Sequence, residues 1–150
     1  MKNVTLTWQR DGQDFDYKSF DRTHMIDYEG GIRVLGCSST KYFGDDCLLN
    51  PDQTLLGALS SCYMLTFLAM ASLKGYVVDS YVDTAEGVLE KNDEGNFWVS
   101  HITIRPEVVF AEGAGPDNES LAGLFESAHQ GYFIANSIKT ELTIAPIIVC

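Results

Sequence analysis

The N-terminal part of the chain alternates polar and apolar positions in short segments. Residues 4–8 alternate in this way, as do residues 24–28 and 32–36. A two-residue period is typical of strands with one buried face, and Gly30-Gly31 between the last two segments predicts a tight turn. Residues 10–20 are polar with scattered aromatic side chains, and they predict neither a helix nor a strand.

The middle of the chain holds a long apolar segment with helix signals at both ends. Asn50 can act as N-cap, Pro51 suits the first helical position, and Asp52 places an acid near the positive end of the helix dipole. Lys74 followed by Gly75 is typical of a helix end. The pattern therefore predicts a helix of about 24 residues, roughly 36 Å long.

The second half of the chain returns to strand patterns, with one more helix. The expected elements are strands over residues 76–91 and 96–110 with a hairpin turn at 92–95, a helix from near Asn118 to about residue 131, and a final strand over 138–149 with Pro146 near its end. Strands grouped in this way around two helices favour an α+β fold with an antiparallel sheet. The length fits a single domain over residues 1–150.

The long predicted helix carries no charged residue between Asp52 and Lys74. A helix that is apolar on nearly every face is either buried or spans a membrane. Polar side chains within it and the lack of a positive flank at Asn50 argue against a membrane span. One sheet covers only one face, so a second subunit is the simplest further cover, and a monomer that covers the helix by itself is the alternative. Close approach of two helices would use the small residues Gly57, Ala58, Ser60 and Ser61.

Charge and cysteine spacing exclude several classes of protein. A net charge of −11 would repel nucleic acid and anionic membrane surfaces. The first residues lack the apolar run of a signal peptide, so a cytoplasmic location is expected. The four cysteines, Cys37, Cys47, Cys62 and Cys150, follow no metal-binding spacing, so we expect free thiols, no metal and no cofactor.

Cys62 lies near the middle of the predicted helix. Cysteine is among the most buried residue types, so a packing role is one interpretation. A reactive thiolate is the other, and it would need a positive partner, because the helix dipole acts only near the helix ends.

Three segments in order resemble one known family, the OsmC/Ohr proteins. Asn50-Pro51-Asp52-Gln53 with Ala58-Leu59-Ser60-Ser61-Cys62 is similar to the central helix of that family. Ala85-Glu86-Gly87-Val88-Leu89, with Arg105-Pro106, resembles its hairpin. Ala128-His129, followed by Phe133-Ile134-Ala135-Asn136-Ser137, resembles its C-terminal signature. The resemblance covers roughly residues 20–146.

The resemblance implies a fold and an activity. It implies an intertwined homodimer in which antiparallel sheets enclose two long central helices, and a thiol peroxidase that reduces organic hydroperoxides. Cys62 matches the cysteine that attacks the peroxide, and Arg22 best matches the arginine that activates it, although Arg10 or Arg33 could take that role. Asp52 matches a family glutamate that holds this arginine, and it is one methylene shorter.

Helix geometry bears on the same residues independently of the resemblance. Asp52 and Cys62 are ten residues apart, about 15 Å along one straight helix. One arginine head cannot bridge that distance. Antiparallel packing of two such helices would bring Asp52 of one chain toward Cys62 of the other, which again favours a homodimer.

The sequence departs from the family at the second cysteine, which resolves the oxidised first one. That position is Tyr132, and tyrosine cannot form a disulfide. Three outcomes stay open. An external thiol or dithiol reduces the oxidised Cys62 directly. Alternatively, Cys37, Cys47 or Cys150 resolves it. In the third outcome peroxidase activity is lost, and a non-catalytic dimer binds a small apolar ligand or senses redox state.

Overall fold

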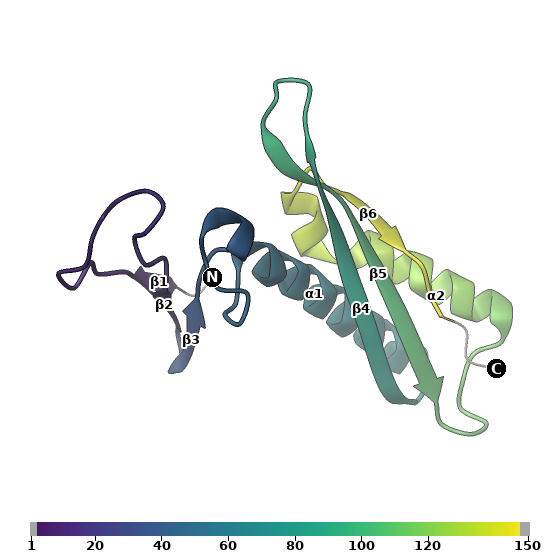
Figure 1. The fold of residues 1–150 in the computed structure, drawn as a ribbon. Coiled ribbons are helices and arrows are strands. Elements are labelled where there is room, and N and C mark those ends of the chain that lie inside the picture. The colour runs from purple at the N-terminus through teal and green to yellow at the C-terminus, as the bar shows by residue number, and fades with distance from the viewer. Residues whose placement is uncertain (1–2, 148–150) are drawn as a thin grey trace. The chain divides into compact units, whose positions relative to one another are not determined.

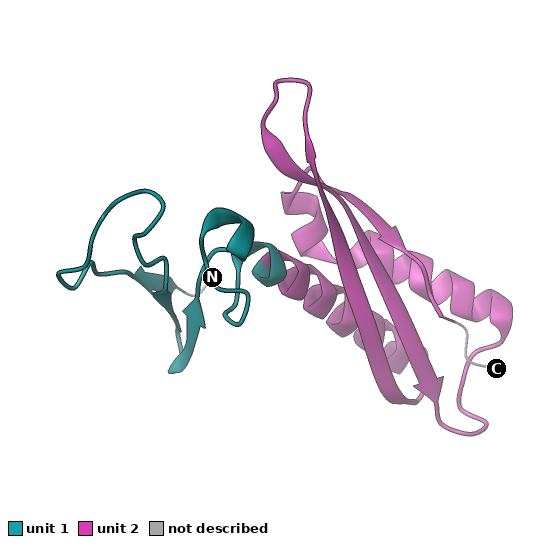
Figure 2. Cartoon of the chain, viewed as in Figure 1, with its two compact units in different colours: residues 1–54 teal, residues 55–150 magenta. Residues whose placement is uncertain are grey.

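The structure is a computed structural model, and it describes residues 3–147. The chain divides into two compact units, residues 1–54 and residues 55–150 (Figure 2). Each unit is described by itself below. The expectation of a single domain over residues 1–150 stays a prediction.

The first unit contains a three-stranded antiparallel sheet in the order β1-β2-β3. Its strands are β1 (Val4–Thr7), β2 (His24–Tyr28) and β3 (Ile32–Gly36), and a short 3₁₀ helix η1 (Thr40–Tyr42) follows. Gly30 and Gly31 form the β2–β3 turn with φ of 104° and 88°, values that glycine adopts without a steric penalty. The three strands and the tight turn confirm the sequence pattern, and residues 8–23 form neither helix nor strand.

Helix α1 (Pro51–Leu73) begins and ends where the sequence predicts. The Gln53 N–H donates to Asn50 Oδ1 at 2.8 Å, and the Asn50 N–H donates to Gln53 Oε1 at 3.1 Å. This reciprocal pair is a capping box, which satisfies amides that the first turn leaves without helical partners. At the other end Gly75 has φ of 80°, and the Tyr76 N–H donates to the Ala71 carbonyl at 3.0 Å. That bond is the signature of a glycine-terminated helix.

The second unit packs two helices against a sheet in the order β4-β5-β6. Its elements are β4 (Val78–Lys91), β5 (Phe97–Phe110), α2 (Asn118–Gly131), the 3₁₀ helix η2 (Phe133–Ser137) and β6 (Glu141–Ile144). Residues 55–73 of α1 lie with α2 on one face of this sheet (Figure 1). The core between them is fully buried and comprises Leu59, Tyr63 and Phe67 of α1, Ile102 and Ile104 of β5, and Leu124 and Ala128 of α2. The fold is α+β, as the pattern predicts.

The final strand differs from the expectation in length and direction. Residues 138–149 were expected as one strand, but β6 covers only Glu141–Ile144. Residues 133–137 form η2 before the strand. Beyond β6, the Ala145 N–H donates to the Ile104 carbonyl and the Ile147 N–H donates to the Pro106 carbonyl, so contact with β5 continues past Pro146 as an isolated bridge at Ile147. β6 pairs with β5 in parallel, a relation between distant segments that a hydrophobic pattern does not contain. Residues 148–149 lie outside the described residues.

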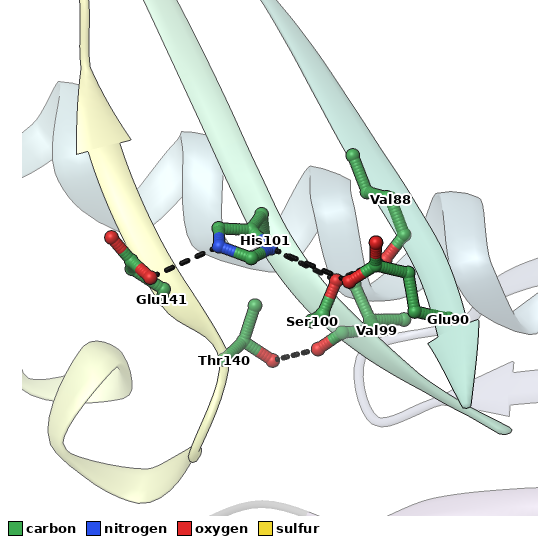
Figure 3. A network of polar contacts seen from close by, with 7 residues as sticks. All are labelled: Val88, Glu90, Val99, Ser100, His101, Thr140 and Glu141. Carbon is green, nitrogen blue, oxygen red and sulfur yellow. Dashed lines mark hydrogen bonds and ion pairs between the residues drawn. The ribbon is translucent and has the colours of Figure 1, made fainter. Parts of the chain in front are cut away.

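A bulge in the β4–β5 hairpin lies beside the polar contacts that hold β6 against β5. The register shifts between Val88 and Leu89, so Ser100 is an extra residue on β5 beside His101. His101 Nδ1 lies 2.9 Å from Ser100 Oγ, and its Nε2 lies 3.0 Å from the carboxylate of Glu141 on β6 (Figure 3). The Thr140 hydroxyl donates to the Val99 carbonyl at 2.8 Å. These contacts fasten a four-residue strand that backbone pairing alone would hold weakly.

Candidate functional site

Cys62 lies on α1 with its side chain buried, 8% exposed, in the core of the second unit. It also lines a hollow of about 650 Å³ along the outer face of α1. The other lining residues are mostly apolar or small: Ala58, Ser61, Leu65, Thr66, Ala69, Met70, Leu73, Phe133 and Ile134. The thiol therefore borders a space that suits an apolar molecule better than a charged one.

Tyr132 is the residue between α2 and η2, and it is buried, 1% exposed. Its ring packs edge-on against Tyr63 at a centroid distance of 5.4 Å and lies 5.8 Å from the His129 ring. Burial raises the pKa of Tyr132 to about 12, with a further contribution from the negative charge of the neighbouring Cys62 thiolate. Tyr132 and Cys62 belong to the same buried core cluster.

The Tyr132 hydroxyl is buried and has no hydrogen-bond partner among residues 3–147. The neighbouring Tyr63 is different, because its hydroxyl donates to the Phe125 carbonyl at 3.1 Å. A buried polar group without a partner costs free energy, so such groups in folded proteins call for a physical explanation.

In the first unit, Arg22 is held in an aromatic cage, which we define as Tyr17, Phe20 and Phe43. Its guanidinium carbon lies 3.9 Å above the Phe20 ring centre, and its two terminal nitrogens donate to the carbonyls of Phe20 at 2.8 Å and Tyr17 at 2.5 Å. Arg22 also lines a mostly apolar hollow of about 470 Å³ together with Trp8, Phe15, His24 and Cys37. Backbone carbonyls and aromatic ring faces thus hold the guanidinium within the first unit.

The other two candidate arginines are in different surroundings. Arg10 donates to the Gln13 carbonyl at 2.9 Å at the exposed surface, and Arg33 pairs with Asp27 at 2.5 Å, also exposed. The lining of the hollow described above includes Arg22 and neither Arg10 nor Arg33. Asp52 is exposed in the first turn of α1, and within residues 3–147 it forms no ion pair with Arg22.

The structure places Arg22 and Asp52 in residues 1–54 and Cys62 and Tyr132 in residues 55–150. It places Tyr132 and Cys62 in the same buried core cluster. It does not test whether Arg22 or Asp52 acts on Cys62, so both assignments stay predictions.

The remaining cysteines differ in accessibility. Cys37 is buried, 2% exposed, and Cys47 is exposed; both are free thiols, as is Cys62. A hydrogen bond to Asp45 and the charge of that carboxylate raise the pKa of Cys47, which disfavours its thiolate. Cys150 lies outside the described residues.

Within the described part of the chain, no group of three histidine, cysteine or acidic side chains could hold a metal ion. His24 contacts the Arg22 carbonyl, His101 belongs to the β5–β6 contacts, and His129 packs against Tyr132. The three histidines therefore have separate local roles.

Comparison with known proteins decides the family. Residues 44–146 match the family described as OsmC-like protein. The chain belongs to this family. An OsmC-like protein of unknown function from Vibrio cholerae is 34% identical, with a TM-score of 0.93, and the match covers 98% of this chain and 99% of that one. The OsmC/Ohr resemblance in the sequence is confirmed.

Two further relatives show how far the likeness extends. The uncharacterized protein YmaD of Bacillus subtilis is 33% identical over 91 residues, which is 60% of each chain. The organic hydroperoxide resistance protein OhrB of Bacillus subtilis is 15% identical, with a TM-score of 0.69 over 98% of both chains. At that identity the likeness to OhrB shows a common fold alone.

Membership of this family bears on α1. Within residues 3–147, α1 is the one helix long and apolar enough to cross a membrane by length and composition. Five of its side chains are nevertheless buried within the protein: Leu59, Cys62, Tyr63, Phe67 and Ala71. The core helix of an OsmC-like domain would pass the same test of length and composition.

Two features of the site have little or no signal in the sequence. The cage around Arg22 comes from aromatic residues in a stretch without regular structure, and only Phe20, two positions before Arg22, hints at it. The orphan hydroxyl of Tyr132 depends on the packing of α1 against α2 and η2.

Proposed function

We propose that this protein is a cysteine-based peroxidase that reduces organic hydroperoxides in cytoplasmic defence against oxidative stress. The observation that carries the proposal is the Cys62 thiol at the wall of an apolar hollow of about 650 Å³. An apolar hydroperoxide would gain more from that lining than hydrogen peroxide would. Membership of the OsmC-like family supports the proposal.

The chemistry needs one thiolate and one positive group. The Cys62 thiolate attacks one peroxide oxygen, an S–O bond forms, and the O–O bond breaks. Sulfur is oxidised by two electrons, the peroxide is reduced by two electrons, and the departing alkoxide takes a proton to leave as an alcohol. We assign activation of the thiol to Arg22, because a nearby guanidinium favours the thiolate, and orientation of that guanidinium to Asp52.

Regeneration must differ from the two-cysteine route. Tyr132 stands where a resolving thiol would be, so the Cys62 sulfenic acid would be reduced by an external thiol or dithiol. Cys37 is a less direct candidate, because it is buried in the first unit.

A homodimer is part of the proposal. In the second unit α1 has an uncharged exposed stripe, defined as Gly57, Ala58, Ser61, Leu65, Ala69 and Ser72. Ser60, expected among the small contact residues, instead donates to Asp83 Oδ1 at 2.5 Å. An uncharged stripe of mostly small side chains lets two helices approach closely, and two-fold dimers are the commonest closed assembly. Ala58, Ser61, Leu65 and Ala69 also line the hollow beside Cys62, so a partner helix would border the substrate site.

The test is the rate at which Cys62 reacts with hydroperoxides. Reduced protein is mixed with cumene hydroperoxide or hydrogen peroxide, and Cys62 oxidation is followed by intact mass and a sulfenic-acid trap. We expect cumene hydroperoxide to oxidise Cys62 much faster than hydrogen peroxide does, and Cys62→Ser to abolish the reaction. If Cys62 reacts with both oxidants no faster than glutathione, the peroxidase proposal is wrong.

A second candidate function is a non-catalytic dimer that binds a small apolar ligand or senses redox state. The replacement of the second cysteine by Tyr132 favours it. It predicts an ordinary buried Cys62 thiol that reacts slowly with hydroperoxides, and the ligand-binding form also predicts binding of an apolar probe in the same hollow. The oxidation rates therefore separate the second candidate from the peroxidase.

The role of Arg22 gives a separate prediction. Arg22→Lys keeps the positive charge but removes the planar fork, so we expect the oxidation rate of Cys62 to fall at least about tenfold, in line with a charge-assisted hydrogen bond of about 1.5–3 kcal/mol. Arg33→Lys is the matched control, because Arg33 is an exposed arginine paired with Asp27. Stopped-flow oxidation rates measure both. Equal rates for Arg22→Lys and the native chain would remove Arg22 from the site.

A further inference from the structure

The Tyr132 hydroxyl is a buried hydrogen-bonding group in the same core cluster as Cys62. No hydrogen bond joins it to the sulfur or to any other atom of residues 3–147. We propose, on the basis of the peroxidase function above, that this hydroxyl donates a hydrogen bond to the sulfenic oxygen of oxidised Cys62. Tyr132, at the position of the family's resolving cysteine, would then protect the Cys62 sulfenic acid, although it cannot form a disulfide with it.

The geometry follows from what oxidation adds. Attack on the peroxide leaves one oxygen on Cys62 sulfur, which extends the side chain beyond the thiol. The only hydrogen-bonding group of a tyrosine side chain is its hydroxyl, and at Tyr132 that group is free of competing partners among the described residues. Because burial raises the pKa of Tyr132 to about 12, the phenol keeps its proton near neutral pH and stays a donor.

The neighbouring aromatic residues restrict where the hydroxyl can go. The Tyr132 ring is fixed edge-on against Tyr63 and beside His129, and the residue is 1% exposed. A ring held in this way keeps its hydroxyl away from bulk water. The hydroxyl therefore loses no hydrogen bond to bulk water when it bonds the sulfenic oxygen. The free energy that an orphan hydroxyl costs in the reduced state is recovered when the oxygen arrives.

Protection of the sulfenic acid matters most in a chain with one cysteine at this site. A sulfenic acid that waits for an external thiol is exposed to a second peroxide molecule, which would oxidise it irreversibly to sulfinic acid. In that step the sulfenic sulfur attacks a peroxide oxygen, the O–O bond breaks, and a second alcohol leaves. A hydrogen bond to the sulfenic oxygen withdraws electron density from sulfur and slows this attack.

Tyr132→Phe tests the proposal, with Tyr63→Phe as matched control. Both changes remove one buried hydroxyl from the same pair of rings, but the Tyr63 hydroxyl is occupied by the Phe125 carbonyl. Each protein is converted to the Cys62 sulfenic acid, and conversion to sulfinic acid in excess cumene hydroperoxide is followed by intact mass. We expect a rate about tenfold higher for Tyr132→Phe, the size of one lost hydrogen bond, and no change for Tyr63→Phe.

The outcomes separate this inference from the peroxidase function. Tyr132→Phe removes no hydrogen bond from the reduced protein, so its thermal midpoint should not fall. Equal sulfinic-acid rates in Tyr132→Phe and the native chain would overturn the inference, as would an equal rise in Tyr63→Phe. If Cys62 reacts slowly with hydroperoxides, the peroxidase function fails. In that case prolonged treatment with hydrogen peroxide still generates the sulfenic acid. Its lifetime in Tyr132→Phe and Tyr63→Phe, each compared with the native chain, then tests the hydrogen bond separately.

Discussion

Tyr132→Cys is expected to change the oxidation product of Cys62 from a sulfenic acid to an intramolecular disulfide. Both positions belong to one buried core cluster. A thiol at position 132 would have a high effective concentration at the oxidised sulfur, so sulfenic-acid labelling should fall at least about tenfold. Intact mass after one equivalent of cumene hydroperoxide measures the product.

Tyr132→Ser is the control for this change. It removes the same aromatic ring and opens the same space, but it introduces no thiol. In Tyr132→Ser the Cys62 sulfenic acid should still react with the sulfenic-acid trap. Only Tyr132→Cys should yield a product that a dithiol converts back to two thiols. A sulfenic acid that persists in Tyr132→Cys would show that position 132 does not face the sulfur.

Local signals predicted α1 well because its ends are decided by neighbouring residues. The cap needs only Asn50 and Gln53, three residues apart, and the structure has both hydrogen bonds between them. The other end needs one glycine that can adopt a positive φ, which Gly75 supplies. The β2–β3 and β4–β5 hairpins were predictable for the same reason, since each turn is encoded where it occurs.

Contacts between distant segments set the limit of the sequence analysis. The pattern in residues 138–149 does not predict that residues 141–144 pair in parallel with β5. That pairing depends on the path of the chain through α2 and η2. The bulge at Ser100 likewise has no local signal. Apolar residues beyond Ile144 lengthened the expected strand, and the structure has only an isolated bridge at Ile147 there.

The residue types of the candidate site were also predictable from the sequence, but their spatial arrangement was not. The residue types at Cys62 and Tyr132 are evident from the resemblance, but they are 70 positions apart, and only packing of α1 against α2 and η2 brings them together. Arg22 best matches the activating arginine of the family, with Arg10 and Arg33 as alternatives. Arg22 stands out because the fold gathers Tyr17, Phe20 and Phe43 around it, which no spacing rule for arginine predicts.

Leu65→Glu is expected to dissociate the proposed homodimer. Leu65 is the largest side chain of the exposed stripe on α1, 60% exposed, and the stripe has no charged residue. A two-fold interface uses the same patch on both subunits, so each dimer would bury two new carboxylates. An unpaired buried charge costs about 3–5 kcal/mol, so the dissociation constant should rise at least about a hundredfold, measured by sedimentation velocity over a range of concentrations.

Val82→Glu separates this effect from a general cost of adding charge. Val82 on β4 is 63% exposed, nearly the same as Leu65, but it lies on the sheet and not on α1. A dimer that survives Val82→Glu and is lost in Leu65→Glu would place the α1 stripe in the interface. The readout is the oligomeric state alone, because Leu65 also lines the hollow beside Cys62 and a glutamate there would lower the Cys62 oxidation rate directly. A Leu65→Glu chain that stays dimeric would exclude the stripe as the contact between copies.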